Sequence, residues 1–184
     1  MIEIISDEID PGAFCYTSGT SGRTKGVLTT HRGSYLADLA NAFESYLSRS
    51  SVYLCLLPAF HAADWTYPWA VTAALGTHYI LHYILRGVDP GLMWDALLDH
   101  GVTRYCGAPT VQIILVNPGK ARRLPRMVRV AIAASAATAD LLGKLERQNS
   151  QSVHFWGLSE SYGRWTKGYF DPSWSHLNVE RGQD

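Results

Sequence analysis

The 184-residue sequence has no excess of charge of either sign, since Lys and Arg together number 16 and Asp and Glu together number 16. Nucleic-acid-binding proteins depend on basic residues that contact phosphates, so this balance argues against a nucleic-acid partner. One basic cluster crosses a connection that contains Pro and Gly, and we interpret it as a solvated loop: Lys120, Arg122, Arg123, Arg126 and Arg129.

Cysteine and long hydrophobic runs are scarce as well. Cys15, Cys55 and Cys106 are an odd number without the spacing of a metal site, and each lies in a predicted buried strand. This pattern is typical of small core residues in a reducing compartment. No apolar run approaches the ~20 residues of a membrane span, and residues 1–10 are acidic rather than basic and apolar. We therefore expect an intracellular protein, cytoplasmic or peroxisomal, without a transmembrane segment.

Strand-like and helical segments alternate along the chain, which is long enough for one domain with a sizeable core. Apolar runs bounded by turn residues predict strands at 13–17, 52–57, 77–85, 102–106, 127–133 and 153–156. Helical spacing and capping residues predict helices at 32–47, 65–75, 90–100, 109–116 and 139–147. This alternation predicts the α/β class, with a mainly parallel open sheet flanked by helices.

Single residues mark the ends and faces of several helices. Asp89 and Thr138 are predicted N-caps, and Gly101 is predicted to close the helix that begins at Pro90. Pro68 is expected in the first turn of its helix or at a kink. The helix at 32–47 has one apolar stripe at helical spacing, formed by Leu36, Leu39, Ala40, Phe43 and Leu47.

The run Tyr16-Thr-Ser-Gly-Thr-Ser-Gly-Arg-Thr-Lys-Gly26 combines hydroxyl side chains with glycines and one lysine near its end. Glycine lets the backbone approach a ligand closely, hydroxyls add donors, and lysine supplies a point charge suited to phosphate. The run is not a P-loop, because Thr24 stands where that motif requires a glycine. A flexible linker is the alternative. The candidate phosphate contacts are Thr17, Ser18, Gly19, Thr20, Ser21, Gly22 and Lys25.

A second candidate segment, Gly157-Leu-Ser-Glu160, joins a permissive glycine to a hydroxyl and a carboxylate. A carboxylate beside a polyphosphate requires a cation between them, so Glu160 is a candidate Mg²⁺ ligand; a solvated turn is the alternative. The segment follows a predicted strand, as do the phosphate loop and Pro58-Ala-Phe-His61. Ligands of open α/β sheets bind beyond the carboxyl ends of the strands, so these three segments are expected at one edge.

The histidines indicate a functional site less clearly than these segments do. A lone histidine such as His61 is more often a structural hydrogen-bonding group than a ligand contact. His78 and His82 have a metal-ligand spacing only on a helix. On the predicted strand they would lie ~13 Å apart and could not share one ion.

The run 16–26 resembles the signature Tyr-Thr-Ser-Gly-Thr-Thr-Gly-x-Pro-Lys-Gly of the AMP-binding, adenylate-forming superfamily. Ser21 replaces a threonine and Thr24 replaces the proline. The segment Phe155–Glu160 is similar to the superfamily's Tyr-Gly-x-Thr-Glu motif, and Pro58–His61 is similar to its Pro-x-Phe-His segment. The segment Ala133-Ala-Ser-Ala136 departs from the usual Gly-Gly-Ala-Pro, which borders substrate in the family.

The resemblance implies a role for each candidate residue. Lys25 and the loop hydroxyls would hold the phosphates of ATP, and Glu160 with Thr20 would bind Mg²⁺. Trp156 would lie against the adenine beside Gly157, Ser159 would contact the α-phosphate, and His61 would line the acid's pocket.

The resemblance further implies an acyl-CoA ligase that activates a small carboxylic acid, with a fatty acid favoured, and that uses coenzyme A as co-substrate. The fatty and aromatic acyl-CoA ligase branch fits the tail residues Trp174, Leu177, Glu180 and Arg181. We expect residues 1–184 to form part of the large domain, without the C-terminal lid domain. The alternative is a truncated remnant that binds nucleotide or a partner protein. Uncovered surface would favour self-association.

Overall fold

The computed structural model describes residues 7–19, 22–58, 60–81, 89–117, 121–168 and 173. Its main feature is a six-stranded sheet in the order β4-β3-β5-β6-β7-β8. The first five of these strands pair in parallel: β3 (Val52–Cys55), β4 (Thr77–Ile80), β5 (Arg104–Gly107), β6 (Val128–Ile132) and β7 (Ser150–Leu158). β8 (Gly163–Lys167) runs antiparallel to β7. The predicted α/β class with a mainly parallel sheet is confirmed.

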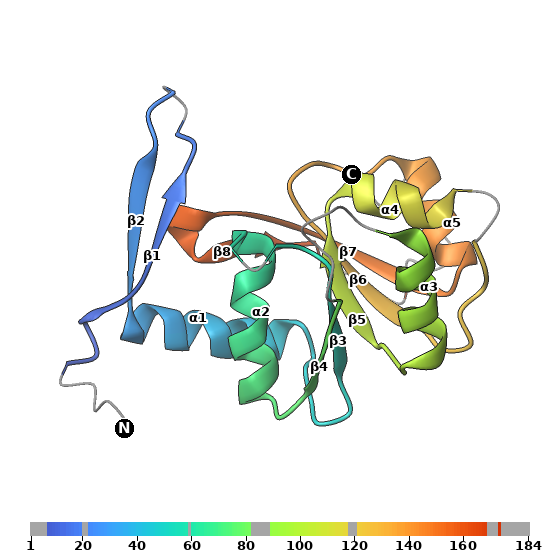
Figure 1. Cartoon of the computed structure of the whole chain (residues 1–184), viewed down its shortest axis with the longest axis horizontal. Coiled ribbons are helices and arrows are strands. Elements are labelled where there is room, and N and C mark those ends of the chain that lie inside the picture. Colours follow the sequence, from blue (N-terminus) through green and yellow to red (C-terminus); the bar gives the residue numbers. More distant parts are fainter. Residues whose placement is uncertain are drawn as a thin grey trace.

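Three helices cover one face of this sheet: α3 (Pro90–Asp99), α4 (Pro109–Val116) and α5 (Ala139–Arg147) (Figure 1). Their apolar residues and those of β5, β6 and the neighbouring strands form the larger core, in which Met93, Leu115 and Leu145 are fully buried. The predicted caps are present. The Asp89 carboxylate accepts from the backbone N–H of Gly91 at 2.6 Å, and the hydroxyl of Thr138 caps α5.

The opposite face of the sheet carries a second, smaller core. Tyr53 and Phe155 of the sheet pack there with Tyr67 of α2 (Ala62–Ala73), and the predicted burial of Cys55 and Cys106 is confirmed. Cys15 is only half-buried. α2 begins three residues before the predicted start, which places Pro68 inside the helix rather than in its first turn.

The apolar stripe of α1 (His31–Glu44) does not face a core. Leu36 is 58% exposed and Phe43 is 80% exposed, whereas the buried residue of this helix is Asp38. α1 packs against α2, and Asp38 accepts a hydrogen bond from Tyr162. The stripe therefore faces outward, because periodicity reveals an apolar face but not which face the neighbouring elements cover.

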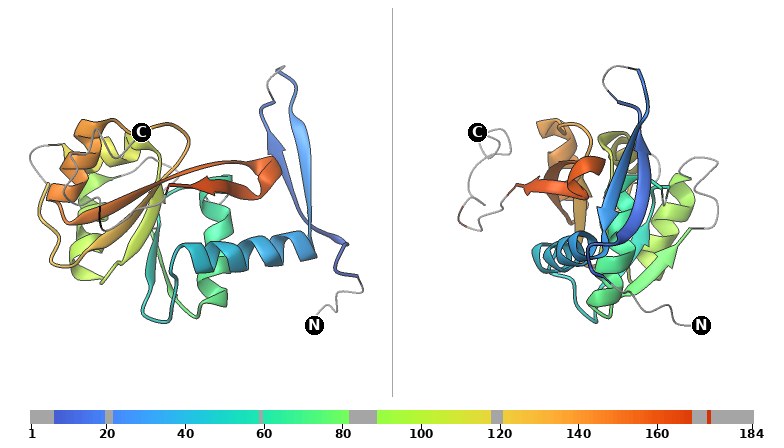
Figure 2. Two further views of the ribbon diagram at one scale, coloured as in Figure 1. Left: turned by 180° about the vertical axis from the view of Figure 1, so that it is seen from behind. Right: turned by 90° about the vertical axis from the view of Figure 1, so that its left-hand side faces the viewer.

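The phosphate-loop run lies in a separate hairpin of β1 (Pro11–Thr17) and β2 (Lys25–Thr30). A strand at 13–17 is confirmed, but a second strand, rather than a helix alone, follows the loop. β1 does not belong to the parallel sheet. Figure 1 and the left view of Figure 2 place the hairpin at one end of the molecule, with the β7–β8 ribbon reaching toward it.

Other boundaries differ from the predictions. β7 continues through Leu158, so Gly157 lies in a strand, and β8 was not predicted. His78 lies on β4 as expected, whereas His82 lies outside the described residues. No helix in the described ranges is both long and apolar enough to cross a membrane.

Candidate functional site

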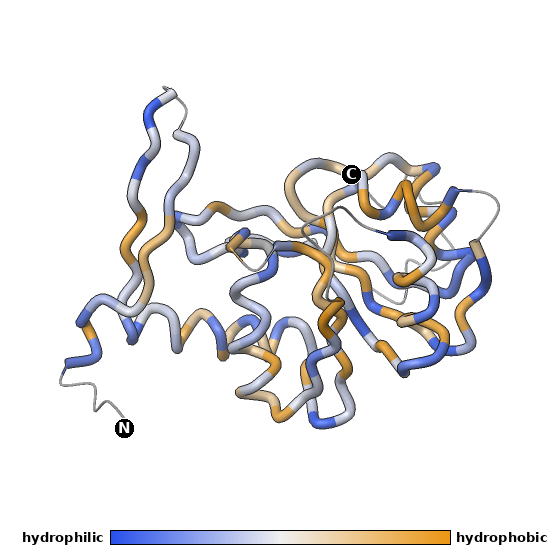
Figure 3. Tube along the Cα trace, in the orientation of Figure 1, coloured by the Kyte–Doolittle hydropathy of each residue, from blue (hydrophilic) through white to orange (hydrophobic). Residues whose placement is uncertain are grey.

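The hairpin ends in a tight glycine-containing turn. Thr17 and Lys25 are the last paired residues of the two strands. Gly19 has φ +65°, and a Cβ there would overlap the carbonyl oxygen of Arg23, so only glycine fits. The side chains of Ser18 and Lys25 are exposed. The hydrophilic tip above a more hydrophobic middle is visible in Figure 3.

Some predicted contacts of the turn are not described. Thr20 and Ser21 lie outside the described residues, whereas Gly22 is described with φ +78°, and a Cβ at this position would meet no atom within 4 Å. The described side-chain donors at this tip are the hydroxyls of Thr17, Ser18 and Thr24, the guanidinium of Arg23 and the ammonium of Lys25, and the turn backbone adds further donors.

Glu160 contacts Thr17 at the base of this turn, although the two residues are 143 positions apart in the sequence. The Thr17 hydroxyl donates to Glu160 Oε1 in a long hydrogen bond of 3.4 Å. Glu160 lies in the short 3-10 helix η2 (Ser159–Ser161), between β7 and β8, and it is exposed. Ser159, half-buried, begins the same turn. The phosphate-loop run and the carboxylate motif therefore lie side by side.

Residues outside the predicted motifs hold η2 in place. Tyr162 has φ +57°, uncommon for a non-glycine residue, and its hydroxyl donates to Asp38 Oδ2 at 3.0 Å. Its ring packs edge-on against Trp65 of α2 at 4.5 Å. Burial raises the pKa of the Asp38 carboxyl to about 6, opposed by the hydrogen bond from Tyr162. Burial also raises the pKa of Tyr162.

Sequence reasoning missed these holding residues. The signal that the sequence offered is the glycine after Tyr162, and in the structure Tyr162 and Gly163 both have positive φ, +57° and +88°. Two successive left-handed residues indicate a fixed backbone beside the carboxylate.

Gly157 lies in β7, where it allows close approach of the β8 backbone, rather than in a turn. It pairs with Arg164 of β8, and a Cβ at this position would overlap the backbone of Gly163. The ladder has an irregularity between Trp156 and Gly157. Trp156 is 53% exposed, so a large part of this residue is accessible at the surface.

His61 lies immediately before α2. Its carbonyl accepts from the backbone N–H groups of Asp64 at 2.8 Å and Trp65 at 3.0 Å, so it opens the first turn of the helix. The Ala62 carbonyl lies against Gly163, next to η2. The His61 side chain is exposed.

The oxygens at this site suit a magnesium ion carried by a polyphosphate. Magnesium in proteins is held by one or two carboxylates, with phosphate oxygens and water completing six ligands. Glu160 and Thr17 provide a carboxylate and a hydroxyl side by side. Across the described ranges no group of three His, Cys, Asp or Glu side chains could hold a metal without such a ligand.

Comparison with known proteins identifies the family. The AMP-binding enzyme family matches residues 3–178. The chain is 35% identical over 170 residues to probable acyl-activating enzyme 5, peroxisomal, of Arabidopsis thaliana, covering 92% of this chain and 30% of that protein. It is 34% identical over 174 residues to acetate–CoA ligase CCL3 of Humulus lupulus, with 93% and 30% covered. Trans-cinnamate:CoA ligase of Petunia hybrida is 32% identical over 179 residues, with 96% and 31% covered.

A solved structure has the same fold. O-succinylbenzoate coenzyme A synthetase of Bacillus subtilis, in complex with ATP and magnesium ion, matches with TM-score 0.80 at 21% identity, over 95% of this chain and 36% of that one. The chain belongs to the AMP-binding, adenylate-forming enzyme family, which confirms the resemblance seen in residues 16–26 and 155–160. It spans about a third or less of the length of these relatives.

Proposed function

We propose that this chain is the nucleotide-holding part of an AMP-forming acid–CoA ligase. The contact between Thr17 and Glu160 is the observation that carries the proposal. It joins a glycine-containing loop of phosphate donors to a carboxylate that can hold magnesium. Neither segment alone has the groups for both the phosphates and the metal ion.

Each group has a part in the proposed reaction. A substrate carboxylate attacks the α-phosphorus of ATP and pyrophosphate leaves, which gives an acyl-adenylate. The thiol of coenzyme A then attacks the acyl carbonyl, and AMP leaves. Lys25 and the turn backbone stabilise negative charge on the phosphates, and Ser159 donates to the α-phosphate. Trp156 contacts the adenine, and His61 lines the pocket of the acid. Magnesium, when bound at Glu160, neutralises phosphate charge.

The substrate in this proposal is a carboxylic acid, with a fatty acid favoured and coenzyme A as acceptor. Acetate and trans-cinnamate, the acids named for two relatives, mark the short-chain and aromatic ends of the range to be tested. An intracellular location, cytoplasmic or peroxisomal, belongs to the same proposal.

Nucleotide binding tests the site directly. Excess ATP with Mg²⁺ should raise the melting temperature of the chain, since a ligand that binds only the folded state stabilises it. Lys25→Ala should remove most of this shift, because Lys25 provides a compact point charge suited to phosphate at the base of the turn, in addition to the guanidinium of Arg23. The matched control is Arg49→Ala, an exposed cation in the connection after α1. Equal shifts in the wild type and Lys25→Ala would show that the turn is not the phosphate site.

A second function, binding of nucleotide without turnover, is favoured by one observation. Ala134 has φ +78°, in the segment that departs from the family's glycines. An alanine there stores strain of about 1–2 kcal/mol where glycine has none. Pyrophosphate exchange that depends on an added carboxylic acid separates the two functions, because a non-catalytic chain would bind ATP without exchange.

A further inference from the structure

The helix α1 connects the two segments that form the candidate site. It follows β2 of the phosphate hairpin without a connecting loop, because β2 ends at Thr30 and α1 begins at His31. Figure 1 and the left view of Figure 2 show α1 running from the base of the hairpin toward the main sheet. The direct hydrogen bond between the two segments, from Thr17 to Glu160, is long at 3.4 Å and therefore weak. Their relative position thus depends on the elements that support them.

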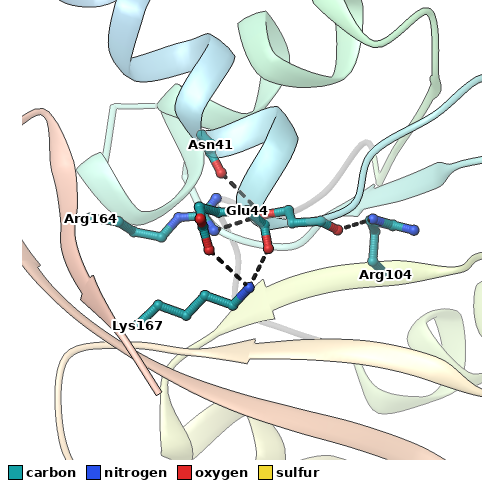
Figure 4. Close-up of polar contacts among 6 residues, drawn as sticks. Asn41, Glu44, Arg104, Arg164 and Lys167 are labelled. Atoms are coloured by element: carbon teal, nitrogen blue, oxygen red, sulfur yellow. Dashed lines mark hydrogen bonds and ion pairs between the residues drawn. The ribbon is translucent and has the colours of Figure 1, made fainter. Parts of the chain in front are cut away.

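The C-terminal end of α1 is fixed to the main sheet by three cations, which Figure 4 shows. Arg104 of β5 donates from Nη1 to the carbonyl of Ser45, the residue after the helix. Arg164 of β8 donates to the Ser45 hydroxyl at 2.9 Å, and Lys167 of β8 pairs with the Glu44 carboxylate at 3.3 Å. Cations also interact favourably with the dipole at a helix C-terminus. This end of α1 is therefore held by the sheet that carries η2.

The N-terminal half of α1 contacts both η2 and the hairpin. The carboxylate of Asp38 accepts from the hydroxyl of Tyr162, directly after η2, at 3.0 Å. Ser34, one turn earlier on the same face, also hydrogen-bonds with the Tyr162 hydroxyl. Ser34 donates to the hydroxyl of Thr29 in β2 at 3.3 Å, and Thr29 donates to the carbonyl of Ala13 in β1 at 3.4 Å. A line of polar groups therefore runs from η2 across α1 to both strands of the hairpin.

Stability does not account for the carboxylate of Asp38. It is the buried residue of α1, and its Oδ1 is buried without a hydrogen-bond partner among the residues that the structure describes. A buried polar atom that lacks a partner costs free energy of folding. Side chains that are retained at such a cost are often those that function requires.

We propose that Asp38 and Ser34 are positioning residues of the nucleotide site, which act through Tyr162 to fix Glu160 at a set distance from the phosphate hairpin. The inference rests on the proposed function, because it names the residues that keep the phosphate loop and the magnesium carboxylate together. Loss of a group that orients a metal ligand typically costs about 10–100-fold in metal affinity. The long contact between Thr17 and Glu160 cannot replace this support.

Calorimetric titrations with ATP, in the presence and absence of Mg²⁺, test the proposal. Tyr162→Phe removes the hydroxyl and keeps the ring that packs against Trp65. It should weaken ATP binding about tenfold with Mg²⁺ but less than about twofold without it, because metal-free ATP does not need the carboxylate of Glu160. Asp38→Ala should have the same selective effect. Asp38→Asn should retain most of the binding, because its amide oxygen still accepts from Tyr162.

Two further variants separate positioning from a general loss of stability. The double variant of Tyr162→Phe with Asp38→Ala should bind no more weakly than either single variant, since both substitutions remove the same hydrogen bond. Tyr105→Phe is the matched control, because the hydroxyl of Tyr105 donates to Gln112 at 2.9 Å in the larger core. It should lower the melting temperature and leave the dependence of ATP binding on Mg²⁺ unchanged.

The outcomes distinguish this inference from the proposed function. If the wild type binds ATP more tightly with Mg²⁺, and Tyr162→Phe behaves like Tyr105→Phe, the hydrogen bond to Asp38 is structural. The positioning role is then wrong, whereas the proposed function stands. If the wild type binds ATP in neither titration, the proposed function fails, and the positioning role fails with it.

Discussion

Asp64 makes the stability of this protein depend on pH. Its carboxylate is 2% exposed and accepts from the hydroxyl of fully buried Tyr53 at 2.8 Å. Burial raises the pKa of Asp64 from 3.8 to about 6, and the hydrogen bond from Tyr53 opposes part of this rise. Between these two values the folded state binds a proton that the unfolded state has released. Protonation of Asp64 therefore stabilises the fold at low pH, and this contribution is lost as pH rises through about 6.

The size of this effect follows from the two pKa values. Each pKa unit corresponds to about 1.4 kcal/mol, so Asp64 lowers the free energy of unfolding by roughly 3 kcal/mol between about pH 4 and pH 7. Asp38 acts in the same direction, because burial raises its pKa to about 6 as well. The wild type should lose stability over this range through both residues.

Asp64→Asn isolates one of the two contributions. The amide oxygen still accepts from Tyr53, but the side chain no longer titrates, so the pH dependence should fall by roughly 3 kcal/mol over the same range. At about pH 7 the variant should be more stable than the wild type, less the cost of burying the two amide N–H donors. Urea unfolding between about pH 4 and pH 7 measures this. Asp95→Asn, at an exposed carboxylate of α3, is the control. Identical slopes for Asp64→Asn and wild type would refute the reasoning.

Three further substitutions test other parts of the structure. Glu160→Gln should weaken ATP binding with Mg²⁺ more than ATP binding without it, because the amide lacks the charge that a hard cation prefers; equal weakening in both titrations would contradict the magnesium role. Ala134→Gly should raise the free energy of unfolding by about 1 kcal/mol, since φ +78° costs alanine but not glycine, and an unchanged urea midpoint would exclude that strain. Arg104→Met should lower the free energy of unfolding by about 2–4 kcal/mol, because two carbonyls that follow α1 lose their donor. A smaller loss than that of the exposed control Arg126→Met would show that water replaces the guanidinium.

The elements that the sequence predicted well are those set by local chemistry. Asp89 and Thr138 accept from backbone N–H groups within three residues, so their caps need no distant partner. The strand around Leu54 was predictable because a run buried on both faces is continuously apolar. Hydrophobic layers of this kind also fix the α/β class, since alternating strands and helices bury their faces only against one another.

The elements that were missed depend on pairing between segments. β2 and β8 each have a half-exposed, mixed pattern, and their partners β1 and β7 become apparent only in three dimensions. The outward stripe of α1 has the same cause, because a helix pattern does not state which face its neighbours cover. The separation of the hairpin from the main sheet also lay beyond reach, since a strand followed by a loop looks alike in both arrangements.

At the candidate site, the groups that can bind a ligand and the residues that hold those groups in place are different. Thr17 and Glu160 have the groups that a nucleotide and its metal require, whereas Tyr162 and Asp38 fix η2 beside them. Motif patterns detect the first pair, but an aspartate and a tyrosine 124 positions apart that hydrogen-bond to each other are ordinary in sequence. The Tyr162–Asp38 pair also responds to pH. The hydrogen bond from Tyr162 strengthens when Asp38 ionises above about pH 6, because charge-assisted bonds are the stronger ones. We infer that Glu160 is held most firmly in a pH range where the fold as a whole is less stable.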